Sequence, residues 1–162
     1  MSNQFVSRRY LTIAALAAIV GLTGLGQVWA HQMSAPEFQA GAMSAYGFED
    51  TVDMLKGTIE AQNLMLIQEI DAQRMLRMVG VQTGGMKQLL FFHPRYMKRI
   101  REANAAATLE PPLKIAVMER PDGKVMVRYI KPSYLFGRYD GLEDIGAELE
   151  QLVETVVASV KS

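Results

Sequence analysis

The sequence predicts an α+β domain in which a three- to five-stranded sheet carries helices mainly on one face. A β-hairpin is the first sign, because residues 114–119 and 124–130 are apolar runs on either side of Pro121-Asp122-Gly123, a typical turn sequence. The second is residues 142–160, where apolar side chains recur at helical spacing between acidic ones. An amphipathic helix of this length needs a surface to cover, and the sheet provides it.

Three further elements are expected between the N-terminal region and this hairpin. Residues 50–63 have the pattern of a short amphipathic helix, with Asn63 placed for a left-handed C-terminal residue. Residues 64–70 are expected to form a strand, and a second helix runs from Asp71 to Gly80. The apolar side of that helix is expected to comprise Met75, Leu76 and Val79.

A second strand and a third helix follow the Thr83-Gly84-Gly85 turn. The strand covers residues 87–92, and its unbroken Leu-Leu-Phe-Phe run suits a strand buried on both faces. His93-Pro94 ends the strand and opens a helix, because proline is tolerated in the first helical turn but not in a central strand.

The first 30 residues have the three parts of an export signal. Arg8-Arg9 precedes an apolar run that starts at Leu11, and small residues at Val28 and Ala30 suit cleavage after Ala30. Residues 11–30 are also long enough for an uncleaved anchor, although three glycines make them a poor permanent span. Both alternatives place the body in the periplasm, soluble or tethered to the inner membrane, and the paired arginines leave a twin-arginine route open beside the general one.

The chain is therefore divided into residues 1–30 as signal or anchor, 31–45 as a flexible arm, and 46–162 as the domain. Its 162 residues suit one domain with one core. The body carries 15 basic against 17 acidic residues, a net charge of −2, which argues against nucleic-acid binding. The lack of cysteine excludes disulfides, thiolate metal sites and covalent haem attachment.

Residues 46–136 resemble the domain-of-unknown-function family 302 (DUF302-like), a small α+β domain found in many exported bacterial proteins. The resemblance rests on short motifs whose spacing fits the family pattern without gaps from Ile70 to Leu135. These motifs are Thr51-Val52-Asp53 with Leu55, Ile70-Asp71, Phe91 with Pro94, Pro112-Leu113-Lys114, Asp122-Gly123-Lys124-Val125, Tyr129, and Pro132 with Tyr134-Leu135. The resemblance implies a fold and no reaction, since the family has no agreed activity.

Three positions depart from the family pattern as this resemblance presents it. Asp71-Ala72 stands where the family usually has Asp-His, so a role of that histidine does not carry over. His93-Pro94 replaces the usual Asn-Pro, and Met97 occupies a position that is often glycine. One histidine and one methionine have thus appeared four residues apart.

This pair is the first candidate site. Four residues separate neighbours on one helical face, so His93 and Met97 can offer an imidazole and a thioether to copper, or serve as axial ligands of a non-covalent haem. His31, as a mature N-terminus, would add its amine and imidazole in a histidine-brace-like copper site. The alternative assigns His93 to a helix cap and Met97 to the core.

A second candidate is a docking surface on the third helix, formed by Arg95, Lys98, Arg99 and Arg101. It suits an acidic protein partner or anionic lipid head groups, and the alternative is an ordinary solvated surface. The carboxylates nearest strand ends are Asp71, Glu69, Glu119 and Asp122, and no pair of them has a spacing that fixes acid and base roles. Because no catalytic motif or phosphate-binding loop is present, the sequence favours a non-enzymatic role, either a periplasmic binding or accessory domain or a membrane-tethered structural subunit without a cofactor.

Overall fold

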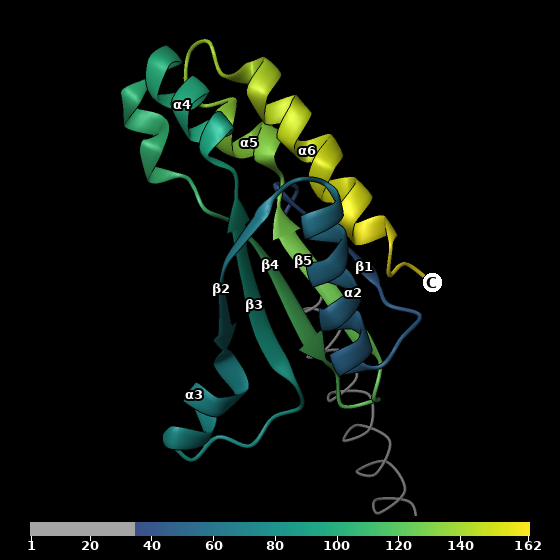
Figure 1. The fold of residues 1–162 in the computed structure, drawn as a ribbon. Helices are drawn as coiled ribbons and strands as arrows, with labels where there is room; N and C mark the ends of the chain where they lie inside the picture. Colours follow the sequence, from purple (N-terminus) through teal and green to yellow (C-terminus); the bar gives the residue numbers. More distant parts are fainter. Residues whose placement is uncertain (1–34) are drawn as a thin grey trace, which may run out of the picture. The chain divides into compact units, whose positions relative to one another are not determined.

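The computed structural model describes residues 35–162, within which residues 37–162 form one compact unit (Figure 1). The predicted signal or anchor at residues 1–30 and the candidate ligand His31 lie outside this part of the chain. Within the described residues, no helix combines the length and apolar character needed to span a membrane.

Five antiparallel strands form a single sheet in the order β1-β5-β4-β3-β2. The strands are β1 (Gln39–Met43), β2 (Met65–Asp71), β3 (Met86–Phe92), β4 (Leu113–Glu119) and β5 (Val125–Ile130). The helices are α2 (Phe48–Ala61), α3 (Ala72–Met78), α4 (Pro94–Ala103), α5 (Pro132–Phe136) and α6 (Glu143–Ala158), with a 3₁₀ turn, η1 (Ala105–Leu109), after α4. The predicted α+β class, the sheet and both hairpin strands are confirmed.

Helices α2 and α6 cover one face of the sheet (Figure 1). Side chains of β4 alternate between the two faces of the sheet: Leu113, Ile115 and Val117 are buried under the helices, while the residues between them face the other way. Val153 and Leu149 of α6 belong to the same buried core as these side chains. Helices α4 and α5 lie at one end of the sheet, and α3 lies at the opposite end.

The predicted flexible arm is wrong for residues 39–43, which form the edge strand β1. Gln39 to Met43 pair in register with β5, and Lys131 N donates to the carbonyl oxygen of Phe38 at 2.9 Å. The segment lacks an obvious apolar alternation because it is short and rich in Gly and Ala. Pairing with an already formed strand supplies the order that its own sequence does not.

The apolar side of the second helix lacks a buried residue. Although α3 forms where expected, none of its residues is buried, and Met75 and Met78 are 60% and 79% exposed. The helix lies at the end of β2 and β3, far from α4, α5 and α6 (Figure 1), and its neighbour in the sheet is β3. Its helical periodicity was read correctly, but periodicity alone does not provide a packing partner.

Gly41 tests whether β1 is a strand or an arm. A Cβ at this position would overlap the carbonyl oxygen of Val127 on β5. We therefore expect Gly41→Ala to lower the free energy of unfolding by about 1–3 kcal/mol, measured by urea denaturation. A matched control is Gly57→Ala in α2, which meets no neighbouring atom within 4 Å and should raise stability by about 0.5–1 kcal/mol. A flexible arm would tolerate Gly41→Ala without effect.

Candidate functional site

Two of the predicted site residues begin helices. His93 is the N-cap of α4, and its Nδ1 accepts a hydrogen bond from the backbone N–H of Arg95 at 3.1 Å. Asp71 is the N-cap of α3, where its carboxylate accepts from Arg74 N at 2.7 Å. Both side chains satisfy backbone donors that the first helical turn leaves without a partner.

Met97 lies one turn along α4 and is partly buried against the core. His93 therefore has a structural role through Nδ1, and Met97 has one through packing, which is the alternative weighed above. Among residues 35–162, no three His, Asp or Glu side chains gather closely enough to hold a metal. Haem or copper ligation by His93 and Met97 stays a prediction, as does the contribution of His31.

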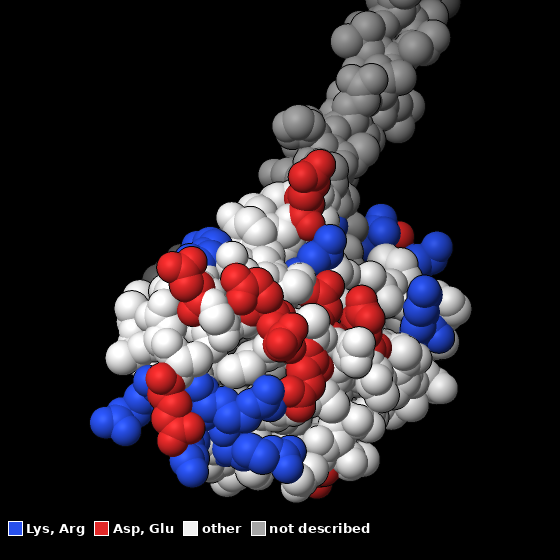
Figure 2. Space-filling model, turned by 90° about the horizontal axis from the view of Figure 1, so that it is seen from above, with Lys and Arg blue, Asp and Glu red and all other residues white. Residues whose placement is uncertain are grey.

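The basic residues of α4 are divided between internal contacts and solvent. Arg99 Nη1 donates to Glu148 of α6 at 2.6 Å, and the guanidinium groups of Arg95 and Arg99 each lie 5.5 Å from the ring centre of Tyr96. Lys98 reaches Glu102 at 3.9 Å, a loose surface pair. Figure 2, which views this end of the domain, shows a cluster of basic side chains beside a band of acidic ones.

Glu148 joins α4 to α6 through two donors. The Tyr96 hydroxyl donates to its Oε1 at 2.7 Å while Arg99 binds Oε2. These two hydrogen bonds, with Tyr96 contributing more, hold the pKa of the Glu148 carboxyl below its usual range. Burial, reinforced by the bond to Glu148, raises the pKa of Tyr96. Part of the basic helix thus fixes the position of α4 on the domain.

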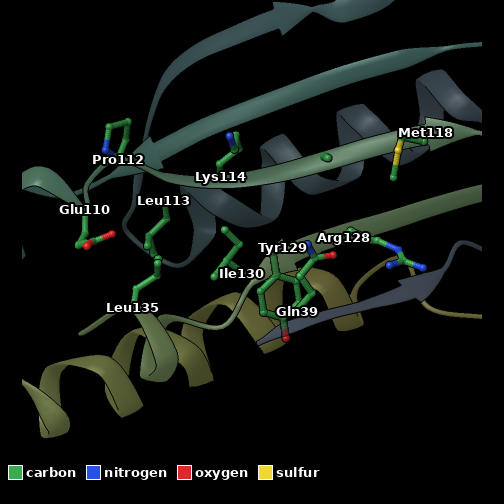
Figure 3. Close-up of a pocket in the computed structure, with 11 residues that line it drawn as sticks. Gln39, Glu110, Pro112, Leu113, Lys114, Met118, Arg128, Tyr129, Ile130 and Leu135 are labelled. Carbon is green, nitrogen blue, oxygen red and sulfur yellow. The ribbon is translucent and has the colours of Figure 1, made fainter. Parts of the chain in front are cut away.

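The sheet face opposite α2 and α6 holds a groove of about 410 Å³, bounded at one end by α5 and by the segment before β4 (Figure 3). Its lining side chains come from β1, β4 and β5 and from these two flanks. They are Gln39, Glu110, Pro112, Leu113, Lys114, Ala116, Met118, Arg128, Tyr129, Ile130 and Leu135. The volume lies within the range of small-molecule sites.

Glu110 is the carboxylate of this groove, and its side chain is only 14% exposed. The Tyr139 hydroxyl donates to Oε1 at 2.6 Å, and Arg138 Nη2 donates to the same oxygen at 2.9 Å. The bond to Glu110 raises the pKa of Tyr139. Because its position is fixed from two sides, Glu110 is a pre-oriented acceptor at one end of the groove, with the cations Lys114 and Arg128 on the neighbouring strands.

This groove is not among the candidate sites that the sequence predicts. A signal was present, since Lys114, Ala116 and Met118 alternate with buried residues and so had to lie on the face away from them. The sequence does not reveal that β1 lies beside β5, or that Glu110 lies over the strands.

An antiparallel five-stranded sheet with helices on one face, and a groove on the other, defines a small α+β domain. The sequence matches the family described as "Domain of unknown function DUF302" over residues 41–160. The chain belongs to this DUF302 family, as the resemblance predicted.

A solved structure supports the fold independently. The crystal structure of an uncharacterized conserved DUF302 protein from Bacillus stearothermophilus superposes with a TM-score of 0.72 at 18% sequence identity, over 78% of this chain and 100% of that chain. No curated protein matches the sequence.

The Glu148 contacts make a testable contribution to stability. At pH 7 we expect Glu148→Gln to lower the free energy of unfolding by about 0.5–1 kcal/mol, because both partners of this half-exposed carboxylate lose its charge. Since the folded pKa lies below the unfolded value, the contribution is present above about pH 4.5 and is lost as pH falls through the folded pKa. Denaturation at pH 7 and pH 3 checks it, with Glu154→Gln on the exposed side of α6 as control. A loss of equal size at both pH values would contradict the ionic contribution.

Proposed function

We propose that this chain is an exported binding or accessory domain that works in the periplasm, and that its ligand site is the groove on the helix-free face of the sheet. The observation that carries the proposal is the groove itself, with a fixed carboxylate, two cations and an apolar floor. Export is supported by the signal pattern of residues 1–30.

The lining chemistry favours a small amphipathic anion. Ile130 and Leu135 offer apolar contact, and Lys114 can pair with a carboxylate or sulfonate. Glu110 accepts a hydrogen bond from a hydroxyl or amide on the same ligand. Few polar groups around an apolar surface are typical of sites that orient one end of a ligand while they bury the other.

The groove predicts binding of the fluorescent amphipathic anion 1-anilinonaphthalene-8-sulfonate. We expect Lys114→Glu to weaken this binding at least tenfold, because it replaces an attractive charge in the groove with a repulsive one and tenfold corresponds to about 1.4 kcal/mol. Fluorescence titration measures the change. Lys124→Glu, which lies in the exposed turn between β4 and β5, is the matched control. Equal binding by the unmodified protein, Lys114→Glu and Lys124→Glu would contradict the groove as the binding site.

The export part predicts the state of the N-terminus in the native cell. We expect protein from the periplasmic fraction to begin at His31, so that its intact mass falls below the 18.0 kDa of the full chain. Full-length protein in the membrane fraction indicates the tethered form instead. Full-length protein confined to the cytoplasmic fraction would contradict export.

A metal analysis and a visible spectrum of the same sample test whether the exported domain binds haem or copper. A Soret band, or bound copper, that His93→Ala and Met97→Ala remove would support ligation by these two residues. It would also place the ligand at the start of α4 rather than in the groove.

The alternative function is that of a membrane-tethered structural or interaction subunit without a cofactor. It is favoured by the exposed basic side chains of α4, among which Arg95, Lys98 and Arg101 extend toward solvent. Such a subunit would retain residues 11–30 and co-purify with membrane proteins. Charge reversal at Lys98 and Arg101 would then release it, whereas it would leave binding in the groove unchanged.

A further inference from the structure

Four methionines lie side by side across four strands of the sheet. Met43 of β1 pairs with Met126 of β5, Met126 pairs with Met118 of β4, and Met118 pairs with Met86 of β3. Residues that pair directly across antiparallel strands point to the same face. The four side chains therefore form one continuous row, called here the methionine row.

The methionine row lies on the face that the helices leave open. In β1, β4 and β5 the neighbouring residues point to the other side: Ala42, Val117, Val125 and Val127 belong to the core or pack against it. The four methionines are each partly exposed, and none belongs to the core or to the side chains packed against it within the described residues. Figure 3 shows one of them, Met118, beside Arg128 of the adjacent strand at the end of the groove away from Glu110.

Ordinary sheet packing does not account for this row. Strands favour β-branched and aromatic residues, and the helix-facing side of β3, β4 and β5 follows that preference with residues such as Leu89, Ile115 and Val127. Methionine is absent from the helix-facing positions of these described strands. It is concentrated on the open face, where its flexible, polarizable thioether is partly exposed.

We propose that the methionine row binds a soft monovalent cation, copper(I), through three of its thioethers. Thioether sulfur is a soft, neutral ligand that selects copper(I) over hard cations. Paired Cβ atoms on adjacent strands are about 4.5–5.5 Å apart. Because methionine has three rotatable side-chain bonds, neighbouring sulfurs on such a row can converge on one ion without any movement of the backbone. The central pair, Met118 and Met126, is common to both possible sets of three.

The sulfur of Met126 is already accessible to a polar group. Arg128 Nε donates to Met126 Sδ at 3.3 Å, so a lone pair of this sulfur is directed to the surface of the sheet. A thioether is a weak acceptor, and a metal ion displaces such a contact at small cost. Repulsion from the guanidinium favours a monovalent ion over a divalent one.

This site is distinct from both sites discussed above. It uses none of His93, Met97 and His31, and it shares only Met118 with the groove. It therefore goes beyond the proposed function, and the two can succeed or fail separately.

The experiment uses the full chain with ¹³C-labelled methionine methyl groups, titrated with silver(I) as a redox-stable analogue of copper(I) in chloride-free buffer. We expect one equivalent to shift the methyl resonances of at least three of the four row methionines. The resonances of Met54 in α2 and of Met75 in α3 should not move. A competition titration with copper(I) and a chromophoric chelator then gives the affinity for the natural ion.

The variants use leucine, because Met→Leu conserves volume and apolar character. We expect Met118→Leu and Met126→Leu each to weaken silver(I) and copper(I) binding at least tenfold, while Met75→Leu leaves it unchanged. An unchanged near-UV circular dichroism spectrum and an unchanged midpoint of urea unfolding show that the variants are folded.

Unshifted row resonances, or undiminished affinity in Met118→Leu and Met126→Leu, would overturn the proposal. Metal affinity that instead depends on His93 and Met97 would also overturn it and would assign the ion to the start of α4. If the unmodified protein binds silver(I) and copper(I) through the methionine row but does not bind 1-anilinonaphthalene-8-sulfonate, the groove is rejected as a ligand site and the metal site stands.

Discussion

The domain depends on burying one face of an antiparallel sheet under two helices. Leu55 and Ile59 of α2, with Leu149 of α6, cover strand residues that are almost fully excluded from water. This burial of apolar surface is the main term that opposes the chain's conformational entropy. The alternation of each strand then commits the residues in between to the opposite face, so the position of the core also decides what the open face displays.

The elements at the ends of the sheet are held by polar contacts rather than by the core alone. Glu148 receives hydrogen bonds from Tyr96 and Arg99, which fasten α4 to α6, while His93 and Asp71 cap the helices that follow β3 and β2. Two residues that stood out in the sequence as candidate site residues, His93 and Asp71, thus complete helix ends. Helix caps and metal ligands draw on the same polar residue types, so sequence alone does not separate the two roles.

The side chains of both proposed binding sites lie on the open face of the sheet. Partly exposed apolar side chains, a fixed carboxylate and two cations lie there together, and the methionine row crosses beside them. Sheets covered on one side usually present polar residues on the other. A face that is apolar, sulfur-rich and concave is suited to hold a ligand, which is why both binding proposals concern the same side of the molecule.

The sequence by itself determined the α+β class, the β4–β5 hairpin, the C-terminal helix α6 and membership of the DUF302 family, because these are encoded in turn residues, local periodicity and spaced motifs. It also determined that His93 and Asp71 lie at helix starts. Only the tertiary structure decided that residues 39–43 are a strand, that α3 lacks a cover, and that Met43, Met86, Met118 and Met126 stand in one row. Strand order and register depend on which distant segments bury their apolar surface against one another. A local sequence pattern does not contain this information.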